Sequence, residues 1–145
     1  MNIGWVVAIG LAAAVVVVGS KAVVGYDGIV MVMAAAIQSF EGWSAGSVSY
    51  RNNNPGNLKY ANQKDALGCD AAGFAVFPTY EAGWAALCTQ LTLAFTGASH
   101  VYSPDDTLGE FFSKYSEGDS SSYANYVADK LGVTAGTRLR DIAHA

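Results

Sequence analysis

The sequence predicts an α+β fold: a mainly helical domain with a small β region, preceded by one apolar segment long enough to cross a membrane. Three observations predict this class. The first 24 residues contain a single charged side chain. A stretch rich in Gly and Asn follows the first helical pattern, and several stretches with apolar residues at helical spacing come after it. That order is typical of an α+β domain. We therefore divide the chain into a transmembrane anchor over 1–25 and a domain over 26–145.

The composition limits the possible partners. The chain has 145 residues, enough for one domain with a core, and only 14% of them are charged, with a formal net charge of -4. The few basic residues are scattered, so no basic face for nucleic acid is expected. Cys69 and Cys88 have no C-x-x-C spacing and no His cluster near them, so we expect no metal and no cofactor. They form either two buried thiols or one disulfide worth roughly 3 kcal/mol.

The apolar segment runs from Ile3 to Val24 and is interrupted only by Lys21. As a helix it would span about 33 Å, close to the hydrocarbon thickness of a bilayer. A secretory signal peptide is the main alternative, but a basic start and an A-x-A cleavage site are missing. A buried core helix is the other alternative. We expect an uncleaved membrane anchor. Lys21 is the one basic residue beside it, which is too few to predict the orientation of the anchor in the membrane.

A buried helix is predicted over 28–40, because Asp27 is a suitable N-cap and the residues after it are apolar nearly all round. Gly42 provides a stop signal. Glu41 therefore lies where the helix ends. The partial negative charge of a helix C-terminus and an apolar neighbourhood both disfavour a carboxylate, so we expect its pKa to be raised.

The β region begins with a turn at 54–57, Asn-Pro-Gly-Asn, which fits a type II turn with Gly56 at positive φ. A short strand is expected over 58–60. A second strand is expected over 73–77, with alternate residues on opposite faces, and Pro78 ends it.

The rest of the chain is predicted to be helical. A long helix is expected over 80–95, capped by Thr79. Its apolar residues recur at helical spacing and therefore belong to the core. Further helices are expected to begin at Ser103 or Asp105, at Ser121 and near Thr137, and the helix from Ser121 is expected to stop at Gly132.

Glu41 is a candidate general acid. It lies where the β region should meet the helical body, and a cleft is expected there. Cleavage of a glycosidic bond needs a proton donor with a raised pKa. The nearby Asn side chains offer both donors and acceptors for hydroxyl and N-acetyl groups, and Tyr and Trp offer flat faces for sugar rings. On this pattern alone, a solvated or capping glutamate is the alternative.

A resemblance adds to this interpretation. The runs AIQSFEGW, SYRNNNPGNLKY and GFAVFPTYEAGWAAL, with TLGEFFSKYSEGDSSSYANYVADKLGV downstream, are similar to a lysozyme-like peptidoglycan-cleaving family of phage virions and prophages. That family resembles soluble lytic transglycosylases in fold. The similarity covers roughly 29–133 and leaves the anchor outside. It implies a lysozyme-like, mainly helical domain with a small β lobe.

The resemblance also implies site residues. The catalytic acid of the family is the glutamate that ends the first domain helix, which corresponds to Glu41. The Asn-rich turn lies across the cleft and late tyrosines line it. In better-known transglycosylases a Ser follows the catalytic glutamate and makes a second contact in the site. Here Gly42 and Trp43 follow Glu41, so that contact cannot be assigned to a residue of this chain. The residues implied or assigned for substrate binding are Asn54, Asn57, Tyr60, Tyr123 and Tyr126.

The reaction type depends on a second carboxylate. A hydrolase needs one, whereas in a lytic transglycosylase the muramyl 6-hydroxyl attacks internally. Asp65, Asp70 and Glu81 are the candidates, and each has a structural alternative in a turn or at a helix start. We expect a single-acid transglycosylase that cleaves the MurNAc–GlcNAc β-1,4 bond. A lysozyme-type hydrolase and a non-catalytic peptidoglycan-binding or structural virion protein are the alternatives. Arg51 is expected to fix the turn, because pairing with Glu41 would lower the pKa of that acid.

The expected partners follow from the anchor and the resemblance. They are peptidoglycan glycan strands, the membrane through the N-terminal segment and, in a virion, other virion proteins. The domain is expected to face the peptidoglycan from a virion membrane or the bacterial inner membrane, and to act in host entry or lysis.

Overall fold

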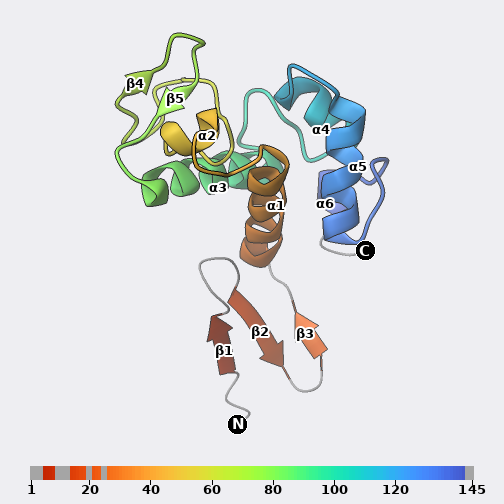
Figure 1. Cartoon of the computed structure of the whole chain (residues 1–145). Helices are drawn as coiled ribbons and strands as arrows, with labels where there is room; N and C mark the ends of the chain where they lie inside the picture. Colours follow the sequence, from red (N-terminus) through yellow and green to blue (C-terminus); the bar gives the residue numbers. More distant parts are fainter. Residues whose placement is uncertain (1–4, 9–13, 19–20, 24–25, 143–145) are drawn as a thin grey trace.

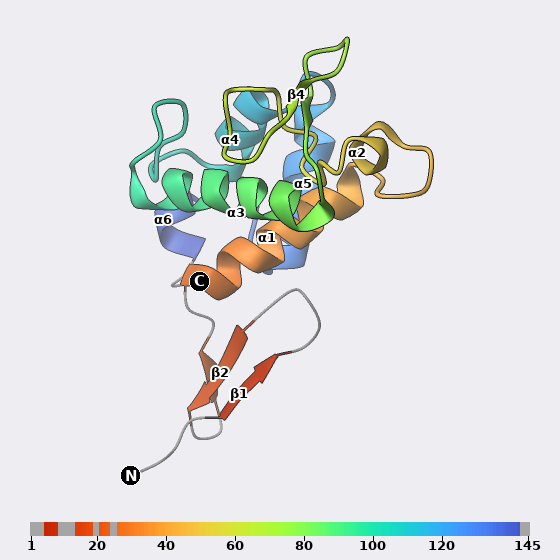
Figure 2. The same cartoon turned by 90° about the vertical axis from the view of Figure 1, so that its left-hand side faces the viewer.

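The computed structural model describes residues 5–8, 14–18, 21–23 and 26–142, and this part of the chain is mainly helical. A small N-terminal sheet lies at one end of a helical body that begins at residue 26 (Figures 1 and 2). The body contains one small β region. The prediction of a mainly helical domain with few strands is therefore confirmed.

The described N-terminal residues form strands and not the predicted helix. Strands β1 (Trp5–Ala8), β2 (Ala14–Val18) and β3 (Lys21–Val23) pair antiparallel in that order, with Val16 opposite Val6 and Val23. Val favours extended backbone because its branched Cβ restricts χ1. The remainder of the predicted span lies outside the described residues. Among those that are described, no helix is both long enough and apolar enough to cross a bilayer.

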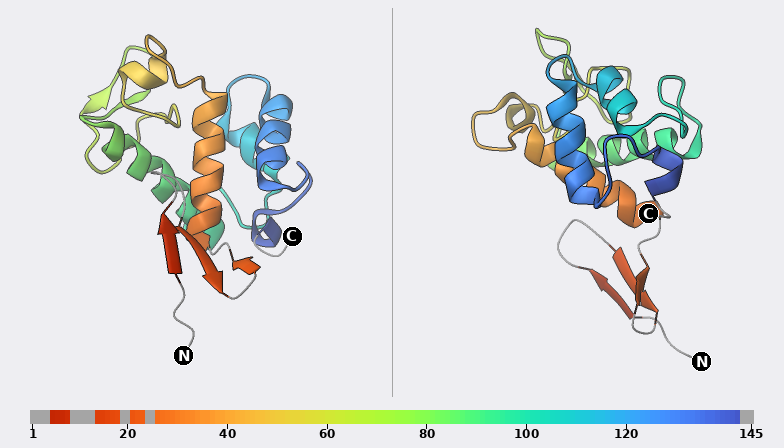
Figure 3. Two further views of the ribbon diagram at one scale, coloured as in Figure 1. Left: turned by 60° about the horizontal axis from the view of Figure 1, so that its bottom comes forward. Right: turned by 90° about the vertical axis from the view of Figure 1, so that its right-hand side faces the viewer.

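Helix α1 (Tyr26–Phe40) forms the centre of the body. It lies between α3 and α5, both of which it contacts (Figure 3). Met33, Ala34 and Ile37 are completely buried. The helix begins two residues earlier than predicted and ends where predicted, so the apolar pattern located it correctly.

Helix α3 (Tyr80–Thr96) matches its prediction to within one residue at its end. The Oγ1 atom of Thr79 accepts a hydrogen bond from the Ala82 N–H at 3.2 Å, which caps the first turn. Gly97 ends the helix with φ of 80°. The side chains of Leu87 and Leu91 are fully buried against the rest of the core.

Helix α4 (Leu108–Tyr115) begins later than predicted. Thr107 Oγ1 accepts from the Glu110 N–H at 3.1 Å, and Glu110 Oε2 accepts from the Thr107 N–H at 2.8 Å. This reciprocal capping box satisfies two backbone donors at the helix start. The predicted start at Ser103 or Asp105 is therefore wrong.

Two further helices complete the body. Helix α5 (Ser120–Leu131) is capped by Asp119, whose Oδ1 accepts from the Ser122 N–H at 3.0 Å. Gly132 ends it in the left-handed conformation, as predicted. Helix α6 (Leu139–Ile142) is the expected last short helix. Helix α5 packs against both α1 and α4 and thereby joins the late helices to the central one.

The small β region, residues 48–77, is called the β lobe below. It contains α2 (Val48–Arg51), β4 (Gly68–Cys69) and β5 (Ala75–Val76), which lie together beside the start of α3 (Figure 1). The two strands pair antiparallel. Ala75 and Phe77 are buried while the residues that alternate with them are half-exposed, so the predicted two-faced strand is confirmed although it is shorter.

The turn at 54–57 differs from its prediction. Its Asn57 N–H donates to the Asn54 carbonyl at 2.9 Å, but positive φ occurs at Asn57, with φ of 50°, and not at Gly56. A type II turn is therefore wrong. Gly56 is needed for close approach instead, because a Cβ there would lie 2.8 Å from both Leu87 Cδ1 and Tyr115 Oη. The glycine lets the β lobe pack directly on α3 and α4.

Cys69 and Cys88 are free thiols, so the disulfide alternative does not hold. Cys69 is exposed on β4, while Cys88 is partly buried on α3. Burial raises the pKa of the Cys88 thiol to about 11.

Asn54 holds the β lobe together from inside. Its side chain is completely buried, and its Nδ2 donates to the carbonyls of Leu58 and Ala75, both at 2.9 Å. Its Oδ1 accepts from the Leu58 N–H at 2.9 Å. Every polar atom of this side chain therefore has a backbone partner, which gives Asn54 a structural role in place of the predicted one in substrate binding.

Asn54→Ala is expected to destabilise the domain by about 3 kcal/mol, because the Leu58 N–H and the Ala75 carbonyl lose a buried partner and the Leu58 carbonyl keeps only the Ala75 N–H. Chemical denaturation of the full chain measures this. Asn125→Ala, at an exposed position on α5, is the matched control and should change stability by less than about 0.5 kcal/mol. A loss below 1 kcal/mol for Asn54→Ala, about the worth of one net hydrogen bond, would contradict the structural role.

Candidate functional site

Glu41 follows the last residue of α1. Its N–H donates to the Ile37 carbonyl at 2.9 Å, which continues the helical pattern by one residue. Gly42 then turns the chain away with φ of 73°. The side chain of Glu41 therefore lies at the C-terminal end of the helix, as the sequence predicted.

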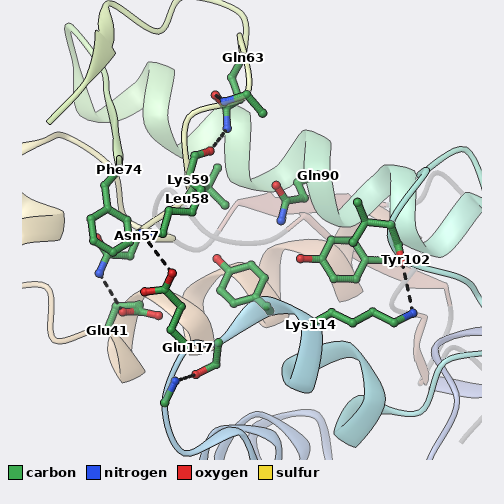
Figure 4. Close-up of a pocket in the computed structure, with 15 residues that line it drawn as sticks. Glu41, Asn57, Leu58, Lys59, Gln63, Phe74, Gln90, Tyr102, Lys114 and Glu117 are labelled. Atoms are coloured by element: carbon green, nitrogen blue, oxygen red, sulfur yellow. Dashed lines mark hydrogen bonds and ion pairs between the residues drawn. The ribbon is translucent and has the colours of Figure 1, made fainter. Parts of the chain in front are cut away.

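Two side chains from distant parts of the sequence hold the Glu41 carboxyl group. Tyr123 Oη, from α5, donates to Oε1 at 2.8 Å. Asn57 Nδ2, from the β lobe, donates to Oε2 at 3.2 Å (Figure 4). The carboxyl group thus lies where α1, α5 and the β lobe meet, and the predicted grouping of Glu41 with Asn57 and Tyr123 is found in the structure.

The pKa of Glu41 is raised. Burial is the largest cause, and the hydrogen bonds from Tyr123 and Asn57 lower the pKa by less than burial raises it. Arg51, the nearest base in the sequence, does not neutralise this acid: its Nη1 donates to the Gly46 carbonyl at 3.0 Å. Glu41 therefore holds its proton to a higher pH than an exposed glutamate does.

The carboxyl group lines a cavity of about 450 Å³, called the Glu41 pocket below. The pocket lies between the β lobe on one side and α3, α4 and the loop after α4 on the other (Figure 4). Its wall mixes aromatic rings, amides and charged groups, which suits a polar ligand with apolar faces. The residues that frame it are Glu41, Asn57, Leu58, Lys59, Ala61, Gln63, Phe74, Gln90, Val101, Tyr102, Lys114, Tyr115, Ser116, Glu117 and Gly118.

Asn57 has one unused polar atom. Its Oδ1 is buried and has no hydrogen-bond partner among the described residues. Such an atom is costly to bury unpaired. A half-turn of the amide would bring Oδ1 to Glu41, where it can accept the proton of the neutral carboxylic acid. Asn57 can therefore pair with either protonation state of Glu41.

Aromatic rings support the acid from behind. Tyr123 stacks on Phe40 with ring centroids 3.9 Å apart, and on Phe112 at 4.4 Å. Tyr115 lies edge-on to Tyr123 at 5.9 Å, and its Oη donates to the Gly56 carbonyl. Burial raises the pKa of both tyrosines, so both stay protonated and act as hydrogen-bond donors.

Two predicted binding residues lie elsewhere. Tyr60 is exposed and its Oη donates to Asn62 Oδ1 at 2.9 Å, outside the Glu41 pocket. Tyr126 shares a hydrogen bond of 2.8 Å with Ser39, and the amino group of Lys130 lies over its ring. Tyr126 therefore faces the side of α1 and does not line the pocket.

The three predicted candidates for a second carboxylate also lie outside the Glu41 pocket. Asp70 shapes the turn before β5, since its Oδ1 accepts from the N–H groups of Ala72 and Phe74. Glu81 lies in the first turn of α3, and Asp65 borders a second cavity. Asp70 and Glu81 thus have the structural roles that the sequence offered as alternatives.

Several residues of the Glu41 pocket were not predicted from the sequence. Glu117 is the other carboxylate in its wall, and it forms an ion pair of 3.3 Å with Lys59 of the β lobe. Lys59 also donates to the Ala72 carbonyl and lies over the ring of Phe74. Tyr115 was missed as well. The aromatic pattern of α4 was the available signal, but it indicated a core and not a cavity wall.

Comparison with known proteins found no relatives. No family model matches the chain, and no curated protein and no solved structure is significantly similar to it. The geometry of the Glu41 pocket is therefore the basis for assigning a function.

Asn57→Gly is expected to raise the pKa of Glu41 further, because it removes a donor to the ionised carboxylate. Glycine is chosen because Asn57 has φ of 50°. A ¹³C NMR titration of the carboxyl group measures the pKa. Asn62→Gly is the matched control, since Asn62 has φ of 55° but contacts Tyr60 and not Glu41.

The same substitution has a pH-dependent effect on stability. A raised pKa means that stability from Glu41 is present below the unfolded-state pKa and is lost as pH rises through the folded-state pKa. Asn57→Gly should therefore lower the melting temperature more at pH 7 than at pH 4. An equal loss at both pH values, or the same pKa shift in Asn62→Gly, would contradict this account.

Proposed function

We propose that this protein is a membrane-anchored lytic transglycosylase of a phage virion or prophage, which cleaves peptidoglycan with Glu41 as general acid and base in a lysozyme-like domain. The observation that supports it is a carboxyl group with a raised pKa in the wall of a cavity of about 450 Å³. Among the described residues, no ion pair includes Glu41. A neutral acid in such a place can donate a proton.

The chemistry requires one carboxyl group with two roles. Glu41 donates its proton to the glycosidic oxygen as the bond between that oxygen and C1 of MurNAc breaks. The 6-hydroxyl of the same sugar then forms a bond to C1, and its proton passes to the Glu41 carboxylate. No water is consumed, and the product ends in a 1,6-anhydro sugar. The acid regains its proton in each cycle.

The partners of Glu41 suit both steps. When Glu41 is ionised, Tyr123 and Asn57 donate to its two oxygens and stabilise the charge. When Glu41 is protonated, the unpaired Oδ1 of Asn57 is the acceptor within reach after an amide rotation. Neither partner carries a positive charge, so neither holds Glu41 in the ionised state.

The wall of the Glu41 pocket fits a sugar chain. Phe74 and Tyr102 supply rings, and Gln90 supplies an amide that can both donate and accept, while the amide of Gln63 is held by the Lys59 carbonyl and the Ala61 N–H. N-acetylated sugars need this combination because one face of each ring is apolar while hydroxyl and amide groups lie around its edge.

The placement of carboxylates favours a transglycosylase over a hydrolase. Glu117 is the second carboxylate of the pocket, but its side chain is 76% exposed and paired with Lys59. A water-activating or charge-stabilising carboxylate has to face the sugar, whereas Glu117 is held by a cation of the opposite wall. The internal 6-hydroxyl makes such a group unnecessary.

Glu41→Gln is expected to reduce release of fragments from purified peptidoglycan at least a hundredfold, since general acid catalysis contributes about 10²- to 10⁴-fold. Mass spectrometry of the wild-type products should find 1,6-anhydro ends. Glu117→Gln is the matched control in the same cavity. It should retain activity within about fivefold, because an exposed ion pair contributes about 1 kcal/mol or less.

Two outcomes would contradict the proposal. Reducing ends in the products together with an inactive Glu117→Gln variant would identify a hydrolase with two carboxylates. Full activity of Glu41→Gln, or wild type that binds peptidoglycan without cleaving it, would leave a wall-binding or structural virion protein.

The membrane part of the proposal rests on the charge-poor N-terminal residues. Open sheet edges cannot satisfy their backbone groups in lipid, so insertion requires the strands of this segment to convert to helix. Ala14→Lys places a charge near the middle of the segment, at a cost of about 3 kcal/mol for insertion. It should move the protein from the carbonate-washed membrane pellet to the supernatant, whereas Asn125→Lys on α5 should not. Equal pelleting of both variants would contradict a membrane anchor.

A further inference from the structure

A second cavity lies beside the Glu41 pocket. It has a volume of about 580 Å³ and is called the side pocket below. The two cavities have five lining residues in common, so they lie side by side. The residues that line both are Ala61, Gln63, Gln90, Val101 and Tyr102.

The floor of the side pocket is one face of α3. It is built from small and apolar side chains: Ala82, Ala86, Thr89 and Leu93. Glu81 is the sole charged residue of this helix. Leu93 is 40% exposed, and Val101, which lines both cavities, is 60% exposed. This floor can cover small aliphatic groups, but it offers few hydrogen bonds.

The rim of the side pocket is charged. Lys64 and Asp65 come from the β lobe, and His100 comes from the loop after α3. Within the described part of the chain, none of the three takes part in an ion pair. They are therefore free to meet charged groups of a ligand. The rim thus suits a ligand that carries carboxylates and an amine.

The Glu41 pocket and the side pocket have different lining residues, and the difference indicates a sugar ligand for the first and a peptide ligand for the second. Sugar sites use aromatic faces and many amides. In the side pocket Tyr102 is the one phenol ring, and it lies in the wall shared with the Glu41 pocket, whereas the Glu41 pocket also has Phe74 and Tyr115. Methyl side chains and an extended backbone fit the alanine-rich floor better than a pyranose does.

We propose that the side pocket binds the short peptide that peptidoglycan carries on its muramyl sugars. This rests on the proposed function, since it takes the glycan itself to lie in the Glu41 pocket. The peptides contain alanine methyl groups, which pack on the α3 floor. They also carry free carboxylates, which face Lys64 and His100, and an amine, which faces Asp65. The protein thereby selects peptide-bearing stretches of glycan over bare ones.

Binding to the full-length Glu41→Gln variant tests this without cleavage. Amide NMR shifts are followed during titration with a soluble disaccharide-peptide fragment of peptidoglycan and with the same disaccharide lacking its peptide. The peptide-bearing fragment should bind about tenfold more tightly, a difference of about 1.4 kcal/mol. Its additional shifts should fall on residues 82–93 and 98–102. Equal affinities, or additional shifts elsewhere, would overturn the proposal.

A variant with the side pocket filled makes the test specific. Thr89 is exposed on the α3 floor, so Thr89→Trp occupies the cavity without disturbing the core. It should abolish the tenfold preference and leave the affinity for the bare disaccharide unchanged. Asn125→Trp, exposed on α5 and outside both cavities, is the matched control and should keep the preference. A preference that survives Thr89→Trp would overturn the proposal.

Cleavage assays separate this inference from the proposed function. Equal cleavage of peptide-bearing and peptide-free glycan by wild type, with equal binding, would uphold the enzyme and overturn the side pocket. Absence of cleavage with the peptide preference intact would uphold the side pocket, as part of a wall-binding domain, and overturn the enzyme.

Discussion

The burial of one carboxyl group at the end of α1 is the constraint on which the rest of the site depends. Burial raises the pKa of Glu41, and the two neutral donors, Tyr123 and Asn57, offset only part of that rise. A cation in place of either donor would reverse the balance. Helix α1, helix α5 and the β lobe must all be packed together for the carboxyl group to be buried, so the pKa of Glu41 depends on the packing of the whole body.

The β lobe reaches the acid through two small structural devices. Asn54 is fully buried, and its side chain forms hydrogen bonds with the Leu58 and Ala75 carbonyls in addition to those between the short strands. Gly56 lets the turn approach Leu87 and Tyr115 more closely than any side chain would permit. Together they set the position of Asn57. A small sheet of this size has little hydrophobic core of its own, so specific hydrogen bonds and close contacts maintain its geometry.

The sequence located the main acid and its helix because helix ends and apolar periodicity are local signals. It could not separate Asn54 from Asn57, because both flank the same Pro-Gly turn and only the fold determines which side chain faces inward. Glu117 and Lys59 are 58 positions apart, and no local pattern links them. In the N-terminal segment a lack of charge is compatible with helix and strand alike, and the many Val residues favour strands.

Lys59 connects the two walls of the cavity through contacts to the Ala72 carbonyl, the Phe74 ring and the Glu117 carboxylate. The last of these is the contact that crosses the opening, and both of its side chains are accessible to solvent. Exposed ion pairs cost about 1 kcal/mol or less to break, which is close to thermal energy, and dissolved salt weakens them further. This contact between the two walls therefore opens at little energetic cost, and it opens more readily as ionic strength rises.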